Sequence, residues 1–190
     1  GSSSGWSSPR FETSDIPGLQ NAGKYPLLVG NCCLTSTYNT NCFGEELLRA
    51  QDKGAIGYIG ASNSTYWDED FYFGVGVGPI VLNPTYESTT LGTYDRAFHD
   101  HGETFADWYT TQGQMFVAGN LAVTQGSPDM ALYYWQVYCL MGDPSLMVYW
   151  GVPEAMSVSY EPLMPLQSDE FTVTAAPYAY VAISKDGILH

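Results

Sequence analysis

Basic residues are scarce in this chain of 190 residues, which has 6 Lys and Arg against 20 Asp and Glu and a formal net charge of -14. Nucleic-acid binding is excluded as a main function, because the positive charge that neutralises phosphates is missing. The acidic field instead attracts cationic partners. Few Lys and Arg also suit a secreted protease that cuts after basic residues, since few self-cleavage sites remain. A surface made soluble by excess acid is the alternative.

Long apolar runs are also missing. No stretch approaches the roughly 18 consecutive apolar residues that a membrane-spanning helix needs, so no membrane span is predicted. The opening segment 1–5 has neither a basic region nor an apolar one, so it is not expected to be a signal peptide. Hydrophobic residues make up 45% and aromatic residues 15% of the chain. This composition predicts one globular domain with a proper core and a small appendage.

Cysteine and histidine are few. The four cysteines, Cys32, Cys33, Cys42 and Cys139, are too few and too irregularly spaced for a disulfide framework. No CxxC pair is present, and the three histidines form no metal-binding spacing with the cysteines, so no zinc site is predicted. We expect Cys42 and Cys139 to be core or edge residues, and Cys32 to pack against a sheet.

One strand–helix–strand unit organises the predicted fold. The run 25–30 is apolar on both faces, as in a central parallel strand, and 43–53 has the spacing of an amphipathic helix. A second buried strand is predicted at 55–60, and such a unit is parallel and right-handed. Ligands bind at the carboxyl ends of strands in open α/β sheets. Cys33 and the segment 61–70 both lie at that edge.

The rest of the pattern predicts further elements. We expect a helical turn at 14–19, helices at 91–100, 103–123 and 128–141, a turn at 142–145, a final strand at 146–149, and antiparallel strands at 170–174 and 180–184. Prolines punctuate the alternating apolar runs from Pro153 onward, which predicts a second, β-rich domain. Too few strands fit there for a free-standing sandwich.

Cys33 is the candidate nucleophile from its position alone, because it follows a strand end where a side chain projects into a cleft. A buried, inert thiol is the more common role of such a cysteine. A catalytic thiol needs a base, and His99 and His101 are the only internal histidines. His101 lies in a predicted turn between helices, so a solvated helix end is its favoured role. His190 is the terminal residue.

An acidic and aromatic segment offers a binding surface. Asp68, Glu69 and Asp70 form a solvated loop, a cation site or the carboxylate floor of a pocket, and the loop is the usual outcome for an acidic run. Trp67 and Tyr66 beside them favour the pocket. A Lys side chain needs an aromatic wall for its stem and a carboxylate for its ammonium.

Five segments together resemble the gingipain family of cysteine peptidases, most of all its lysine-specific members. They are Asn31-Cys32-Cys33, Cys42-Phe43-Gly44-Glu45, Tyr66-Trp67-Asp68-Glu69-Asp70, Ala118-Gly119-Asn120-Leu121-Ala122 and Tyr180-Val181-Ala182-Ile183-Ser184-Lys185-Asp186-Gly187. The resemblance implies an α/β fold, a caspase-like α/β/α sandwich, of which residues 1–152 are the C-terminal part of the catalytic domain. Residues 153–190 are implied to be the start of an immunoglobulin-like β-sandwich, truncated in this chain.

The same resemblance implies a Cys–His dyad that hydrolyses peptide bonds after basic residues, with Lys favoured over Arg. By this match Cys33 is the nucleophile, and the backbone N–H groups of Gly1 and Cys33 form an oxyanion hole. Asp70 receives the substrate ammonium. The implied substrate-binding residues are Trp67, Asp70, Tyr66 and Asn31.

The resemblance also bears on partners, cofactors and location. The catalytic His is implied to lie one residue before Gly1, so the N-terminal half of the catalytic domain is an expected partner, in the same protein or as a separate processed chain. We expect this chain alone to be inactive. No cofactor is needed for the chemistry, although structural calcium occurs in the family and Glu45 is a candidate ligand. A secreted or cell-surface location is implied. The alternative is a catalytically inactive, gingipain-like surface binding or adhesion module.

Overall fold

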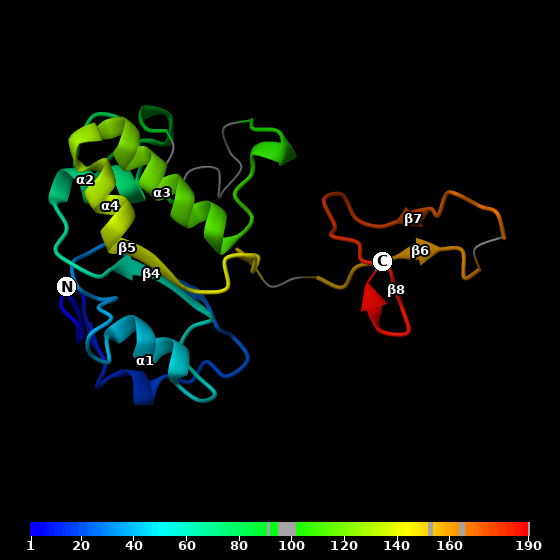
Figure 1. The fold of residues 1–190 in the computed structure, drawn as a ribbon, viewed down its shortest axis with the longest axis horizontal. Helices are drawn as coiled ribbons and strands as arrows, with labels where there is room; N and C mark the ends of the chain where they lie inside the picture. The colour runs from blue at the N-terminus through cyan, green and yellow to red at the C-terminus, as the bar shows by residue number, and fades with distance from the viewer. Residues whose placement is uncertain (91, 95–101, 152–153, 164–165, 190) are drawn as a thin grey trace. The chain divides into compact units, whose positions relative to one another are not determined.

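The computed structural model describes residues 1–90, 92–94, 102–151, 154–163 and 166–189, and the chain divides into two compact units, Gly1–Val148 and Tyr149–His190 (Figure 1). The assignment of 1–152 and 153–190 to two domains stays a prediction. His99, His101 and His190 lie outside the described residues, as does most of the helix predicted at 91–100.

The first unit is mixed α/β. Its elements in chain order are β1 Gly5–Ser7, β2 Arg10–Glu12, η1 Ile16–Gly18, β3 Leu27–Gly30, α1 Phe43–Arg49, β4 Gly57–Ala61, α2 Trp67–Gly74, η2 Tyr86–Ser88, η3 Phe105–Asp107, α3 Gln112–Gly126, η4 Pro128–Met130, α4 Ala131–Val137 and β5 Tyr138–Gly142. The predicted helical turn at 14–19 is present as η1.

The central sheet has the order β3-β4-β5. Strands β3 and β4 are parallel, with Leu27 opposite Gly57 and Gly30 opposite Gly60, so the predicted strand–helix–strand unit is confirmed. Strand β5 runs antiparallel to β4. Because β3 and β4 end at the same edge, the loops that follow them meet there.

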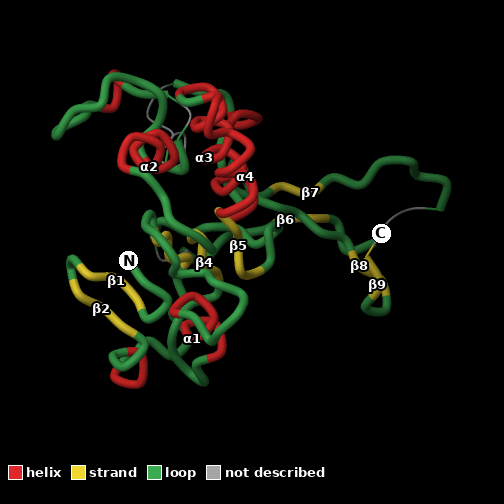
Figure 2. Tube along the Cα trace, turned by 60° about the vertical axis from the view of Figure 1, so that its left-hand side comes forward, coloured by secondary structure: helices red, strands yellow, loops and turns green. Residues whose placement is uncertain are grey.

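Helices cover both faces of this sheet. Side chains alternate along β4, so Tyr58 packs with Phe43 and Leu47 of α1 on one face. Ile59 packs on the other face in a core formed largely with α2, α3 and α4, which includes Phe73 and Tyr134. Figures 1 and 2 both show α1 on one side of the strands and α2, α3 and α4 on the other. The described part of the unit is therefore a three-layer α/β/α arrangement.

Two sequence predictions are wrong in type. The predicted helix 128–141 ends at Val137, and residues 138–142 form β5, because pairing with β4 satisfies their backbone. The predicted strand 146–149 is limited to a single bridge between Met147 and Thr111. Of the alternatives left open for the acidic segment, the solvated loop is excluded, since α2 begins at Trp67 with its acids in the first turn, where the helix dipole favours them.

Two predicted helices have different bounds. Helix α1 ends at Arg49, short of the predicted Lys53. The chain then turns back through Gly54, whose φ of 87° favours glycine. The helix predicted at 103–123 becomes the single turn η3 followed by α3. Gly113 lies in α3 close to Pro144, and a Cβ on Gly113 would sit 2.8 Å from the Pro144 carbonyl oxygen.

The second unit contains two short antiparallel pairs. Strand β6 (Ser159–Tyr160) pairs with β7 (Val173–Thr174), and β8 (Ser184–Lys185) pairs with β9 (Ile188–Leu189). Antiparallel pairing is confirmed for part of the predicted strand 170–174, of which Val173 and Thr174 form β7. Of the predicted strand 180–184 only Ser184 lies in a strand, so that prediction is wrong over residues 180–183. The immunoglobulin-like identity of this unit stays a prediction.

Candidate functional site

The loop that carries Cys33 is held against the loop that follows β4. The N–H of Leu34 donates to the carbonyl of Asn63 (3.1 Å), and the N–H of Ser36 donates to that of Ala61 (3.0 Å). Leu34 adopts a left-handed backbone with φ of 66°, which is uncommon outside glycine. The sharp turn after Cys33 is thus stabilised by contacts across the sheet edge, as the topology predicted.

Thr65 faces the sulfur of Cys33 with three polar groups. Its backbone N–H donates to Sγ at 3.2 Å, and its hydroxyl and carbonyl oxygens lie 3.6 and 3.7 Å from Sγ. Burial of the half-buried thiol raises its pKa, but hydrogen bonds from the backbone and side chain of Thr65 oppose burial, and the pKa of Cys33 is lowered. This environment favours thiolate.

The environment of Cys32 favours the neutral thiol, in contrast to that of Cys33. It is also half-buried, and burial raises the pKa of its thiol. A Cβ built on Gly1 would lie 2.6 Å from Cys32 Sγ and 2.8 Å from the carbonyl oxygen of Cys33. The structure therefore brings Gly1 and Cys33 together. The oxyanion role of Gly1 stays a prediction.

Aromatic packing fixes the segment that begins with Gly1. The indole N–H of Trp6 donates to the hydroxyl of Tyr58 (3.2 Å), and the ring of Trp6 packs on Phe43 with centroids 5.4 Å apart. The N–H of Phe43 donates to the carbonyl of Ser3 (2.8 Å). These contacts tie the segment to both β4 and α1, and so hold Gly1 beside the cysteine loop.

Three hydroxyl groups surround the carboxylate of Asp70. Thr65 donates to Oδ2 at 2.6 Å, and Tyr138 and Tyr134 donate to Oδ1 at 2.8 and 3.1 Å. Burial raises the pKa of Asp70, and the three hydroxyl donors lower it without cancelling that effect. Neither ion pair found in the described residues includes Asp70. The carboxylate is desolvated and has hydroxyl partners but no cationic one there.

Asn31 completes the same network. Its side-chain N–H donates to the backbone carbonyl of Asp70 (2.7 Å), and its Oδ1 lies 2.7 Å from the hydroxyl of Tyr138, which shares its one hydrogen between Asn31 and Asp70. Two predicted site residues, Asn31 and Asp70, are thus joined directly. Thr65, Tyr134 and Tyr138 were missed, although Thr65 directly precedes the acidic motif and that position was a usable signal.

The two aromatic residues of the acidic motif, Trp67 and Tyr66, are exposed. The side chain of Trp67 is 93% exposed and that of Tyr66 is 51% exposed. The backbone N–H of Tyr66 donates to the hydroxyl of Tyr134 (2.9 Å), which anchors the start of α2 beside Asp70. An exposed indole next to a desolvated carboxylate is an arrangement that suits the stem and charge of a cationic side chain.

Glu45 does not fit a calcium site. Its carboxylate pairs with Arg49 at 2.9 Å on the surface of α1. Calcium takes 6–8 oxygen ligands, and within the described part of the chain no three His, Cys, Asp or Glu side chains gather in one place. A structural calcium ion stays a prediction without a ligand set in this chain.

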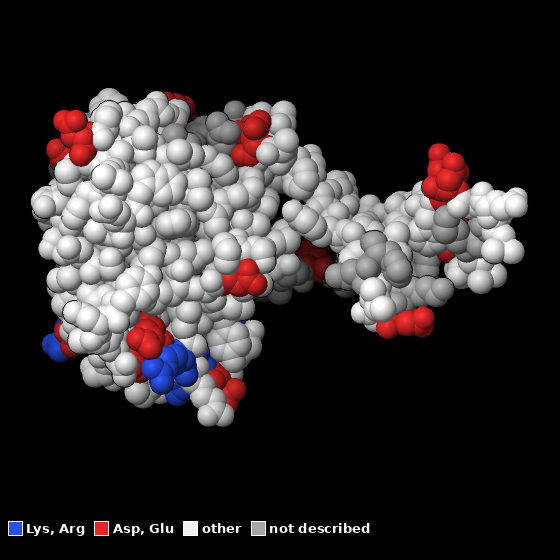
Figure 3. Space-filling view, viewed as in Figure 1, with Lys and Arg blue, Asp and Glu red and all other residues white. Residues whose placement is uncertain are grey.

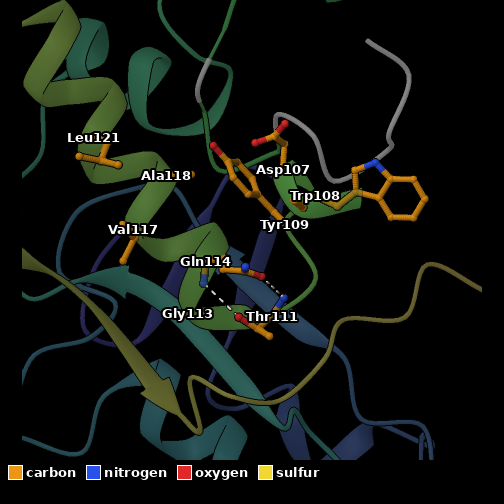
Figure 4. Close-up of a pocket in the computed structure, with 10 residues that line it drawn as sticks. Asp107, Trp108, Tyr109, Thr111, Gly113, Gln114, Val117, Ala118 and Leu121 are labelled. Carbon is orange, nitrogen blue, oxygen red and sulfur yellow. Dashed lines mark hydrogen bonds between the residues drawn. The ribbon is translucent and has the colours of Figure 1, made fainter. Parts of the chain in front are cut away.

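Charge and cavities do not point to a second catalytic centre. Figure 3 shows a largely uncharged face on which the basic side chains lie at the α1 end of the first unit. A cavity of about 420 Å³ lies beside α3, lined by Tyr109, Gln114 and Leu121 among others (Figure 4). Gln114 and Thr111 cap α3 through a mutual pair of hydrogen bonds, so these two polar side chains of the cavity serve the helix.

Cys42 and Cys139 lie where the sequence predicted them. The four cysteines are free thiols, with Cys42 buried and Cys139 half-buried on β5, as expected for core or edge residues. Among the residues with a described structure, no helix has the length and apolar character to cross a membrane.

Comparisons with known proteins agree with one another. The profile of Peptidase family C25 matches residues 1–149. A Lys-gingipain of Porphyromonas gingivalis is 37% identical over 199 aligned positions, covering 100% of this chain and 11% of that protein. Gingipain R2 of the same organism is 26% identical, covering 98% of this chain and 24% of that protein.

Solved structures show the same fold. A structure titled "Structure of Protease" superposes with a TM-score of 0.84 at 38% identity and covers 100% of this chain and 42% of its own. The crystal structure of the Arg-specific cysteine proteinase gingipain R has a TM-score of 0.79 at 21% identity, covering 100% of this chain and 41% of its own, a likeness of fold. The chain thus spans about two fifths of these solved chains.

Proposed function

Because the chain belongs to peptidase family C25, we propose that it is part of a gingipain-like cysteine endopeptidase in which Cys33 is the nucleophile. The observation that carries this proposal is the environment of Cys33, a half-buried thiol at a strand end. Its sulfur accepts the N–H of Thr65, and its pKa is lowered. Thiolate is the reactive form of cysteine, so this thiol is prepared for attack on a carbonyl carbon.

The general base of the proposed dyad is a histidine directly before Gly1. Support comes from the position of Gly1, which lies against the carbonyl of Cys33. The histidine takes the thiol proton as Cys33 attacks and returns it to the leaving amine as the peptide bond breaks. Water then hydrolyses the acyl-enzyme and regenerates the thiol. The N–H groups of Gly1 and Cys33 stabilise the oxyanion.

The proposed preference is for Lys over Arg. Asp70 offers a desolvated carboxylate with hydroxyl partners, so an ammonium that reaches it gains a charge-assisted hydrogen bond. Trp67 and Tyr66 cover the stem of the bound side chain, and Asn31 holds the backbone of Asp70 in place. The identity of 37% to a Lys-gingipain supports this preference.

The proposed partners are polypeptides with Lys or Arg at the cleavage site and the N-terminal half of the catalytic domain. Strand β3 is an edge of the described sheet and pairs with β4 alone, so its free edge offers backbone groups to further strands. Unit two is proposed to be the start of an immunoglobulin-like domain. The proposed location is secreted or cell-surface.

The test uses the full-length encoded protein and lysyl and arginyl peptide substrates. We expect Cys33→Ala to abolish cleavage, whereas Cys139→Ala keeps it. Asp70→Asn loses the preference for Lys while Cys33 remains open to alkylation. Asp68→Asn, on the exposed side of the same helix, is the matched control and keeps the preference. Cleavage by Cys33→Ala at the wild-type rate would refute the nucleophile assignment and favour a surface binding module.

A further inference from the structure

One hydroxyl group lies between the proposed nucleophile and the proposed specificity carboxylate. Thr65 Oγ1 is 2.6 Å from Asp70 Oδ2 and 3.6 Å from Cys33 Sγ, and the Thr65 N–H donates to the same sulfur at 3.2 Å. A threonine hydroxyl carries one hydrogen and accepts through its lone pairs. It therefore cannot donate to the carboxylate and to the sulfur at the same time.

The distances show which acceptor has the hydrogen in the unliganded chain. The bond to Asp70 is short and charge-assisted, which is the stronger kind, whereas 3.6 Å to sulfur is long. With its hydrogen on Asp70, Thr65 presents lone pairs to Cys33. The thiol then donates its own hydrogen to Thr65 Oγ1 or to the Thr65 carbonyl, 3.7 Å away. Both contacts favour the neutral thiol and act against the Thr65 N–H, whose hydrogen bond to Sγ favours thiolate.

We propose that Thr65 is a positioning residue that couples occupation of the Asp70 pocket to ionisation of Cys33. This inference rests on the proposed function. When a substrate ammonium donates to Asp70, the carboxylate no longer holds the Thr65 hydrogen, and the hydroxyl turns to donate to Cys33 Sγ. The thiol proton leaves to the general base, and no other bond changes. The thiolate is therefore favoured when a basic side chain fills the pocket, so specificity enters the chemical step.

The charge of Asp70 also acts on the ionisation of Cys33, in the same direction as the turn of the Thr65 hydroxyl, and an experiment has to separate the two effects. The negative charge of Asp70 itself raises the pKa of Cys33, so its neutralisation by an ammonium favours thiolate without any hydroxyl. Among the described residues, the hydroxyl of Tyr133 also interacts with the Cys33 thiol, and in the full-length protein the proposed histidine before Gly1 does so as well. Both stay constant across variants at Thr65 and Asp70.

Asp70→Asn reproduces the occupied state without a ligand. An asparagine keeps Oδ1 for the two tyrosine hydroxyls and presents an N–H to Thr65 Oγ1, which releases the hydroxyl hydrogen toward Cys33. The double-mutant cycle combines this change with Thr65→Val, which removes the hydroxyl at constant volume. Thr65→Ser retains the hydroxyl and is the conservative control. Thr65→Ala is a second variant without the hydroxyl, for use if the valine variant does not fold.

The readout is the pH profile of Cys33 alkylation by iodoacetamide in the full-length protein. Fragment-ion mass spectrometry separates Cys33 from Cys32. With the hydroxyl present, we expect Asp70→Asn to raise the alkylation rate at neutral pH about tenfold, the worth of one hydrogen bond to a charged group. Thr65→Ser shows the same rise. In Thr65→Val or Thr65→Ala the rise is about threefold or less, from charge removal alone.

An equal rise with and without the hydroxyl overturns the coupling. That result leaves the proposed function intact, because Cys33 remains the alkylated nucleophile. Failure of the proposed function has a different signature, namely unchanged peptide cleavage by Cys33→Ala. The two failures are therefore distinguishable in the same set of variants.

Discussion

The surroundings of Cys33 and Cys139 differ in the kind of group that faces each sulfur, although both thiols are half-buried at the same sheet. Cys33 Sγ accepts the N–H of Thr65, whereas Cys139 Sγ donates to the carbonyl of Gly60 at 3.4 Å. An N–H stabilises thiolate and a carbonyl stabilises thiol. Burial raises the pKa of Cys139, while the pKa of Cys33 is lowered. The balance between burial and nearby donors therefore favours thiol at Cys139 and thiolate at Cys33.

The largest expected effect is a difference in alkylation between these two thiols. At neutral pH we expect iodoacetamide to modify Cys33 faster than Cys139 by on the order of 100-fold, because the thiolate is the reacting form. A time course read by peptide mass spectrometry measures both rates in one sample. Comparable rates would remove the contrast between the two regions and the main argument for Cys33.

The next effect concerns the hydroxyl of Tyr138, which lies within hydrogen-bond distance of both Asn31 Oδ1 and Asp70 Oδ1 and shares its one hydrogen between them. Tyr138→Phe leaves both acceptors short of a partner, so we expect kcat/KM for a lysyl peptide to fall about tenfold, the worth of one hydrogen bond to a charged group. Tyr133→Phe is the matched control, since its hydroxyl donates only to the carbonyl of Ser64 (2.8 Å). A fall in kcat/KM of equal size in Tyr133→Phe would show that the Tyr138 hydroxyl has no particular importance for the site.

The smallest effect is on stability. The raised pKa of Asp70 means that the folded state binds its proton more tightly than the unfolded state. Asp70 therefore favours folding at pH below the ordinary value of 3.8, and this contribution is lost as pH rises through the raised folded pKa. Above that pKa, the desolvated carboxylate costs stability.

We expect Asp70→Asn to have a higher Tm than wild type at neutral pH, because the amide carries no desolvated charge, and each kcal/mol so gained moves Tm by about 2–4 °C. The difference should vanish as pH falls below the folded pKa. Calorimetry at several pH values measures it, with Asp68→Asn as the exposed control. A gap that widens toward acid contradicts the assigned direction of the shift.

The sequence was sufficient for the parts of the fold set by continuous local patterns. The apolar run before Asn31 and the amphipathic spacing after Cys42 correctly predicted β3, α1 and β4 and their shared edge. Strand β5 could not be predicted from such patterns. Residues 138–141 are apolar on both sides, which fits a buried helix as well as a buried strand, and only pairing with β4 decides between them.

Some residues of the candidate site could likewise be recognised from the sequence, and others could not. The motif around Cys33 and the one around Asp70 were recognisable, and the structure brings them together through Thr65. Tyr134 and Tyr138 were not recognisable as site residues, because their hydroxyls reach Asp70 across 64 and 68 positions of sequence. Long-range contacts of this kind depend on how α4 and β5 pack.

The central claim is that Cys33 is the nucleophile of a site that recognises a basic side chain, and one labelling measurement tests it most directly. A peptidyl-lysyl acyloxymethyl ketone is incubated with the full-length protein, and the modified residue is located by mass spectrometry. The account predicts a thioether at Cys33, strongly reduced in Asp70→Asn and retained in Asp68→Asn. A label on another residue, or equal labelling of Cys33→Ala, would contradict it.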